Sequence, residues 1–102
     1  MRFLIKVSMP VEAGNKAAKK GNFEIVASIL SEQKPEAAYF ATFDGQRTGF
    51  IFIDMDDASQ IPLIAEPWFL SLNASVEIRP VMTPDDLEKA GTHIEKAVKK
   101  YG

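Results

Sequence analysis

The sequence of 102 residues contains no cysteine and a single histidine, His93. Without cysteine the chain can form no disulfide, and it offers neither a thiolate nucleophile nor a thiolate metal ligand. One histidine cannot build a histidine-rich zinc site within one chain. The sequence therefore predicts no metal site, and no motif in it indicates a bound cofactor.

An excess of charge of one sign is also missing. The chain has 12 Lys and Arg residues against 14 Asp and Glu residues, spread along its length, for a formal net charge of −2. Proteins that bind nucleic acids usually carry a basic patch that displaces counterions from phosphate, and this pattern provides none. The first apolar run is broken by Lys6 and is too short for a signal sequence or a membrane span. We therefore expect a cytoplasmic protein with neither a nucleic acid nor a membrane as its partner.

Several common ligand-binding and catalytic motifs are missing as well. The acidic cluster at residues 54–57 is followed by Ser59 and Ala65, where an EF-hand loop needs glycine and glutamate. The lysines of residues 14–21 precede the second glycine, whereas a P-loop places its lysine after it. No serine has the surroundings of a nucleophile elbow. The acidic cluster is instead typical of a strand end followed by a helix cap.

Hydrophobic periodicity divides the beginning of the chain into a strand and a helical region. Residues 2–9 alternate between two faces, which predicts a half-buried strand that ends at Pro10. Residues 11–33 have helical spacing instead. Because glycine is a poor helix former and asparagine a good N-cap, Gly21 and Asn22 predict two helical pieces or one kinked helix.

The middle of the chain predicts a β-hairpin. Residues 37–43 and 47–54 are rich in aromatic, small and β-branched side chains, and the pair Asp44-Gly45 lies between them. Asp-Gly is a strong signal of a tight hairpin turn, and so short a connection requires antiparallel strands.

A second crossover helix is expected after the hairpin. Asp56 or Asp57 can cap a helix that runs through Ile64. Pro67 suits the first turn of a short continuation, because a proline in a first turn loses no helical hydrogen bond. Trp68, in that continuation, is expected in the core.

The last part of the chain predicts a strand and a terminal helix. Residues 74–82 alternate again, and Thr83 and Pro84 provide an N-cap and a first-turn proline for a helix that runs to about Lys100. The resulting order is that of an α+β, ferredoxin-like βαββαβ fold with an extra C-terminal helix. A chain of this length fits one domain, residues 1–102.

The hairpin strands predict a partner for the sheet. Residues 49–53 hold no polar side chain, although a sheet with one face in water should alternate. Helices can cover one of the two faces, and the other would be a large exposed apolar patch. The simplest cover is the same face of a second copy, which predicts a homodimer or a higher homo-oligomer, the homodimer being a dimeric α+β barrel. A chain this small also gains useful burial from pairing.

The usual strand order of this topology suggests where a ligand could bind. The first strand then lies between the third and the fourth, so that Lys6 neighbours Glu77 and Arg79. Beside them lie Phe50 and Phe52 or their alternates on the third strand, because both faces of the hairpin are apolar. A small organic acid could bind there, because Lys6 and Arg79 are available for an anion. The candidate ligand-binding residues are Lys6, Tyr39, Phe50, Phe52, Trp68, Glu77 and Arg79. The alternative is a ladder of cross-strand ion pairs that only pins the interface.

Three functions remain open at this stage. The first is a homodimeric domain that binds a small molecule between helices and sheet or between facing sheets. The second is a cofactor-free enzyme, an oxygenase or isomerase, with Lys6, Glu77 or His93 as the proton-transfer group and Tyr39 orienting the substrate. The third is a structural or assembly role without a ligand. His93 borders the apolar stripe of the terminal helix, where a partly exposed structural histidine is expected.

Three segments resemble those of a known protein family. They are residues 34–40 (KPEAAYF), 61–67 (IPLIAEP) and 76–84 (VEIRPVMTP). The chain resembles uncharacterised small bacterial proteins of the dimeric α+β barrel superfamily, close to a domain-of-unknown-function group. The superfamily includes cofactor-free monooxygenases, isomerases and haem-handling proteins, so the resemblance implies a fold and a dimer but no reaction. Some relatives are labelled pantothenate synthetase, but the HIGH-type motif of that enzyme is missing here.

Overall fold

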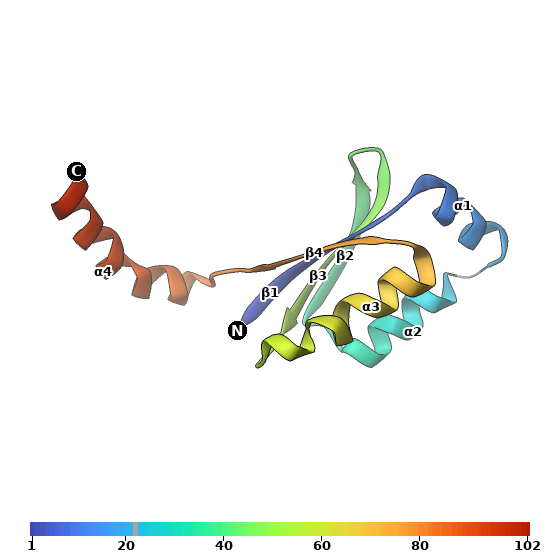
Figure 1. The fold of residues 1–102 in the computed structure, drawn as a ribbon, viewed down its shortest axis with the longest axis horizontal. Coiled ribbons are helices and arrows are strands. Elements are labelled where there is room, and N and C mark those ends of the chain that lie inside the picture. Colours follow the sequence, from blue (N-terminus) through green and yellow to red (C-terminus); the bar gives the residue numbers. More distant parts are fainter. Residues whose placement is uncertain (22) are drawn as a thin grey trace.

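The protein has an α+β fold, seen in a computed structural model that describes residues 1–21 and 23–102 (Figure 1). The sheet has the antiparallel order β2-β3-β1-β4. Its strands are β1 (Arg2–Met9), β2 (Ala37–Phe43), β3 (Gln46–Asp54) and β4 (Ser75–Pro80). The helices are α1 (Val11–Lys19), α2 (Glu24–Gln33), α3 (Ile61–Leu72) and α4 (Pro84–Tyr101). The predicted ferredoxin-like order, with the first strand between the third and the fourth, is confirmed.

The hairpin turn forms as its sequence predicts. Asp44 and Gly45 have φ angles of 53° and 75°, so both central residues lie in the left-handed region. Two such residues make the mirror-image turn whose twist matches that of the flanking strands. The hairpin is confirmed, and β3 begins one residue earlier than predicted, at Gln46.

The first crossover consists of two separate helices, which is one of the two alternatives that the sequence predicted. Helix α1 ends at Lys19 and α2 begins at Glu24, and between them Gly21 has a φ of 70°. This left-handed conformation costs glycine little and interrupts the helix. The predicted N-cap, Asn22, lies outside the described residues.

The second crossover is one continuous helix, so the prediction of a separate piece beginning at Pro67 is wrong. Asp57 caps a short 3₁₀ turn, Ala58–Gln60, that leads into α3, and the Ser59 N–H donates to its carboxylate at 2.8 Å. Ile64, Trp68 and Leu72 are all buried. Their four-residue spacing crosses Pro67, and burying this face outweighs the cost of about 3 kcal/mol for an interior proline.

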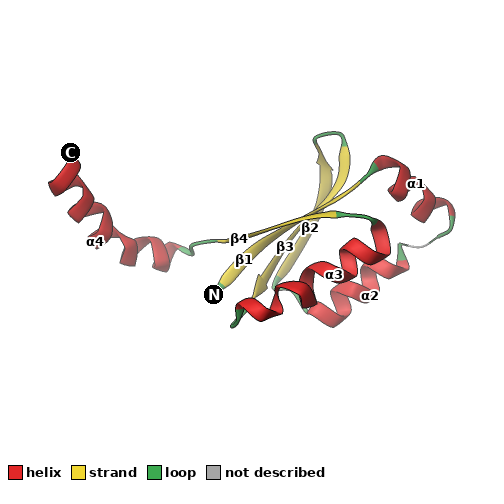
Figure 2. Ribbon diagram, in the orientation of Figure 1, coloured by secondary structure: helices red, strands yellow, loops and turns green. Residues whose placement is uncertain are grey.

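The core lies between the sheet and helices α1 to α3, which gather on one side of it (Figure 2). Ile5 and Ile51, which pair across β1 and β3, are both 0% exposed. Trp68 packs in the same core from α3. Side chains therefore occupy the space between helices and sheet.

Helix α4 differs from the other helices because it stands away from the sheet (Figures 1 and 2). None of its residues is buried. The radius of gyration is 17.1 Å, against about 13 Å for a compact chain of this length. Thr83 and Asp86 form its capping box, in which the Asp86 N–H donates to Thr83 Oγ1 at 3.2 Å. The predicted start of this helix is confirmed, whereas β4 ends at Pro80, before the predicted residue 82.

The buried core gives a first prediction. Ile5→Ala is expected to lower the free energy of unfolding by about 2–5 kcal/mol, because it leaves a cavity between β1, β3 and α3. Urea unfolding followed by the fluorescence of the single, buried Trp68 measures this. Leu63→Ala, at a position of α3 that is 66% exposed, is the control and should cost less than about 0.5 kcal/mol. Equal losses for the two variants would contradict the packing.

The Asp57 cap gives a prediction about pH. The hydrogen bond from the Ser59 backbone lowers the pKa of Asp57 below its ordinary value. A lowered pKa stabilises the folded state above the unfolded pKa, near 4, and this contribution is lost as pH falls. Asp57→Ala should therefore be less stable than the wild type at about pH 7, and the difference should shrink toward about pH 2. A difference that grows on acidification, in urea unfolding at both pH values, would contradict the cap.

Candidate functional site

One face of the sheet carries no helix, and we call it the open face. Along each strand the residues alternate between this face and the core, so the β-register decides which side chains share it. Lys6 lies at its centre, because β1 pairs it with Phe50 on β3 and with Glu77 on β4. The candidate residues that share the open face are Lys6, Tyr39, Phe50, Phe52, Glu77 and Arg79. The structure thus brings together six of the seven residues that the sequence suggested.

Trp68 is the exception. It lies on α3, on the opposite side of the sheet, and is only 2% exposed. It belongs to the core and is separated from the open face by the sheet itself. Its Nε1 has no hydrogen-bond partner within the described part of the chain.

Lys6 lies in aromatic surroundings. Its Nζ is 4.2 Å from the centre of the Phe43 ring, and Phe43 meets Phe50 edge-to-face at a centroid distance of 5.6 Å. A cation over an aromatic face is worth about 0.5–1 kcal/mol at an exposed site. The sequence argument missed Phe43, although the alternation of β2 places it on the same face as Tyr39.

On the open face, the Glu77 carboxylate forms an ion pair with a neighbour on its own strand. Glu77 Oε2 lies 3.6 Å from Arg79 Nη2, and both side chains are more than half exposed. Among the described residues it forms no ion pair with Lys6, so the predicted cross-strand ladder does not close. An exposed pair of this kind contributes little to stability. The Lys6 ammonium is therefore available for an outside anion.

Of the three proton-transfer candidates, Lys6 and Glu77 lie opposite each other on the open face, at paired positions of β1 and β4. His93 is not part of this arrangement, because it is an exposed residue of α4, the helix that stands away from the sheet. Within residues 1–21 and 23–102, no group of three His, Cys, Asp or Glu side chains could hold a metal ion. Glu77 is more than half exposed and pairs with Arg79, so neither Glu77 nor His93 has the enclosed surroundings of a catalytic acid or base.

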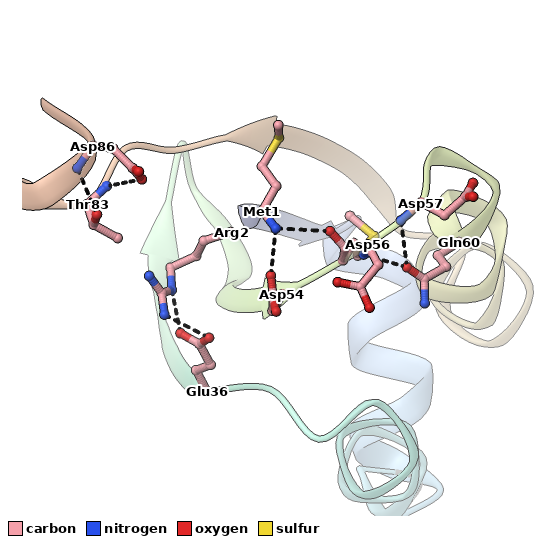
Figure 3. Close-up of polar contacts among 10 residues, drawn as sticks. Met1, Arg2, Glu36, Asp54, Asp56, Asp57, Gln60, Thr83 and Asp86 are labelled. Atoms are coloured by element: carbon pink, nitrogen blue, oxygen red, sulfur yellow. Dashed lines mark hydrogen bonds and ion pairs between the residues drawn. The ribbon is translucent and has the colours of Figure 1, made fainter. Parts of the chain in front are cut away.

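Ion pairs fix one end of this face (Figure 3). Arg2 Nη2 and Nε donate to the two carboxylate oxygens of Glu36, the former at 2.9 Å, which raises the pKa of Arg2. The Met1 ammonium donates to Asp54 at 2.8 Å and lowers the pKa of that carboxyl. These contacts tie β1 to the start of β2 and to the end of β3. Arg2 is thereby paired with Glu36, as Arg79 is with Glu77, and among the described residues Lys6 is the cation of the face that forms no ion pair.

Two grooves of the described chain lie away from the open face. One, of about 690 Å³, lies between α1, α2 and the end of α3, and Lys16, Ile25 and Leu72 are among its lining residues. The other, of about 440 Å³, lies at the base of α4 beside Arg2, Pro80 and Met82. Neither is lined by a candidate residue of the open face. In one chain that face is an open surface, and a cavity there needs a cover.

The described helices include none with the length and apolar character needed to cross a membrane.

Comparison with known proteins gives a family but no activity. The domain of unknown function DUF3303 matches residues 1–95, which include the whole sheet, α1 to α3 and most of α4. No curated protein matches the chain. The open face lies entirely within the matched residues. The chain therefore belongs to the DUF3303 family, a family of domains of unknown function.

Proposed function

We propose that the protein is a homodimeric domain that binds a small organic anion between the open faces of two sheets. The observation that carries this proposal is the Lys6 ammonium, which lies over Phe43 on a face without any cover. An apolar, aromatic surface with a few placed charges is the usual lining of a small-molecule site. Such a site must also enclose its ligand, and one chain supplies only half of the enclosure.

A second copy supplies the other half. Tyr39 is 66% exposed and Phe43 is 45% exposed, and they adjoin Phe50 and Phe52 in one patch. A two-fold axis buries the same patch of both copies at once, and sheets packed face to face lie about 10 Å apart. This is the arrangement of a dimeric α+β barrel, the superfamily in which we place the family.

The charge of the face selects the chemistry of the ligand. Lys6 and Arg79 are cationic, and Glu77 balances one of these two charges through its pair with Arg79. One net positive charge is left on the face of each copy, and a two-fold axis would bring the two together. Like charges that lose water repel one another, so an anion between them is favoured. The rings of Tyr39, Phe43 and Phe50 add flat apolar surface. An aromatic carboxylate fits both features, and the exposure of Glu77 and His93 favours binding over a reaction.

The dimer can be tested through the open face. The wild type is expected to sediment at twice the chain mass of 11.3 kDa, and Phe50→Lys to sediment as a monomer, because the new lysine would add a second cation beside Lys6 in the interface. The control is Leu70→Lys on the outer side of α3, where the residue is 80% exposed. It should remain dimeric. A wild-type monomer, or a dimer of Phe50→Lys whose Trp68 fluorescence shows an intact fold, would overturn the proposed dimer.

The ligand class can be tested with matched probes. Benzoate is expected to raise the melting temperature, and the neutral analogue benzamide is not, because only the anion meets Lys6 and Arg79. At ten times its Kd a ligand stabilises the folded state by about 1.4 kcal/mol. Lys6→Met should remove the response, whereas Lys16→Met on α1 should keep it. A dimer that shows no difference between benzoate and benzamide would contradict anion binding and favour an assembly role.

A further inference from the structure

The two edges of the sheet differ in how they are protected against pairing with another strand. At one edge, β4 carries Glu77 and Arg79 and ends at Pro80. At the other edge, the seven residues of β2 include no charge and no proline. Charged side chains and prolines are devices that keep an edge strand from pairing with another chain. The β2 edge has neither device.

No other segment of the described chain covers the β2 edge. Residues 39–43 are all exposed, and the side chains of Tyr39 and Phe40 are among them. Helix α4 leaves from the opposite edge of the sheet. There the Val81 N–H donates to Arg2 O at 3.0 Å and continues the pairing of β4 past its last residue. The outer side of β2 is therefore open to a further strand.

The hairpin fixes which backbone groups of β2 point outward. Phe43 and Gln46 flank the two-residue turn and bond to one another, so Phe43 and every second residue before it bond to β3. The residues between them are Ala38, Phe40 and Thr42, whose N–H and C=O groups point away from the sheet. Each of the three offers one donor and one acceptor along the edge.

A second copy of β2 matches this edge in one antiparallel register. With Phe40 of the two copies opposite one another, Ala38 of each copy lies opposite Thr42 of the other. Opposite residues that both point toward the partner strand exchange two backbone hydrogen bonds. All three outward residues are thus satisfied at once. A register shifted by two residues leaves one of them beyond the end of the other strand.

The side chains on the open face fit the same register. Tyr39 lies opposite Ala41 of the other copy, and Phe43 lies opposite Ala37, so each aromatic ring meets a small side chain. Residues directly opposite one another in a sheet have Cβ atoms only about 4.5–5.5 Å apart, where like charges would repel. With no charge on β2, the pairing brings no like charges together.

Phe40 is at the centre of the pairing and faces the helix side of the sheet. It is 55% exposed, and its ring lies on Gly49 of β3, where an added Cβ would be 3.0 Å from Phe40 Cε1. The ring therefore leans over its own sheet and leaves room beside the edge. The rings of two copies flank the two-fold axis, and aromatic pairs across strands are favourable.

We propose that β2 is an interface through which two copies of the chain join their sheets edge to edge. The two-fold axis of an antiparallel strand pair is perpendicular to the sheet, so both open faces stay on one side of the joined sheet. The contact leaves the open face free and is independent of the face-to-face dimer. Four chains can make both contacts in a closed tetramer when the axis of the face-to-face dimer crosses the strands, because β2 then lies over β2.

The edge contact is weaker than a standard interface. Seven residues give an edge about 24 Å long, and a sheet about 10 Å thick makes this a surface of about 240 Å². A standard interface buries about 800 Å² on each partner. Edge pairing is therefore expected at high protein concentration. At low concentration only the open-face dimer remains, and there Phe50→Lys is compared with the wild type.

A proline on the outward side of β2 tests the edge. Thr42→Pro removes an outward N–H and no bond to β3, and edge strands tolerate proline at such a position. The control, Thr42→Val, loses the same hydroxyl and keeps the N–H. In sedimentation at rising concentration, the wild type and Thr42→Val should pass from two chains to four, and Thr42→Pro should stay at two. A folded Thr42→Pro that associates like the wild type overturns the edge.

A charge swap tests the register and replaces the proline variant if that variant does not fold. Phe40→Lys and Phe40→Glu should each stay at two chains, because like charges lie opposite one another, and an equal mixture should associate at least about tenfold more tightly. Thr42→Lys mixed with Thr42→Glu is the control. Its charges lie about 13 Å apart in this register, beyond the Debye length of about 8 Å, so mixing should change little. A Phe40 mixture that gains nothing overturns the register.

The failure of this inference and the failure of the proposed function give different results. A Phe50→Lys chain that passes from one chain to two at high concentration, and loses this with Thr42→Pro, supports the edge without the facing sheets. A wild type that stays at two chains at every concentration overturns the edge and keeps the proposed dimer. A wild type that stays a single chain throughout overturns both.

Discussion

The structure depends on one constraint: both faces of the sheet are apolar, and helices cover only one of them. Residues 49–53 of β3 hold no polar side chain, and the pleat sends Ile51 and Ile53 into the core while Phe50 and Phe52 face the other way. Helices α1 to α3 complete the first face. The second is left with aromatic rings and a lysine, and covering it would remove further apolar surface from water.

The same constraint explains why a binding site can arise without a pocket in the single chain. The register places Lys6 between Phe50 and Glu77, and Arg79 draws Glu77 to itself. The Lys6 ammonium then lies on an aromatic surface. Water solvates its charge in the single chain, whereas a second sheet would exclude that water and make the buried charge unfavourable. An organic anion would balance that charge, so the proposed dimer and the proposed anion binding would favour each other. Helix α4 likewise exposes apolar side chains, with Leu87 and Ile94 more than half exposed.

Local signals in the sequence predicted most of the fold. The alternation of residues 2–9, the Asp44-Gly45 turn and the Thr83 cap each act within a few residues, and the structure confirms them. Strand order followed from the topology and brought six candidate residues to one face. The failures came from contacts between distant residues. Pro67 lies inside a helix because α3 packs against the sheet, Trp68 belongs to the core, and the outward course of α4 depends on the link after β4.

The central claim is that the open face is buried in a homodimer, and amine labelling of Lys6 tests it most directly. The chain would be treated with acetic anhydride over a dilution series, and the modification of Lys6 would be compared with that of the exposed Lys16 by mass spectrometry. The account predicts that Lys6 is protected at high protein concentration and gains reactivity on dilution, while Lys16 reacts equally throughout. If the ratio of the two rates does not change with concentration and Lys6 reacts freely in every sample, the open face is not an interface and the account is contradicted.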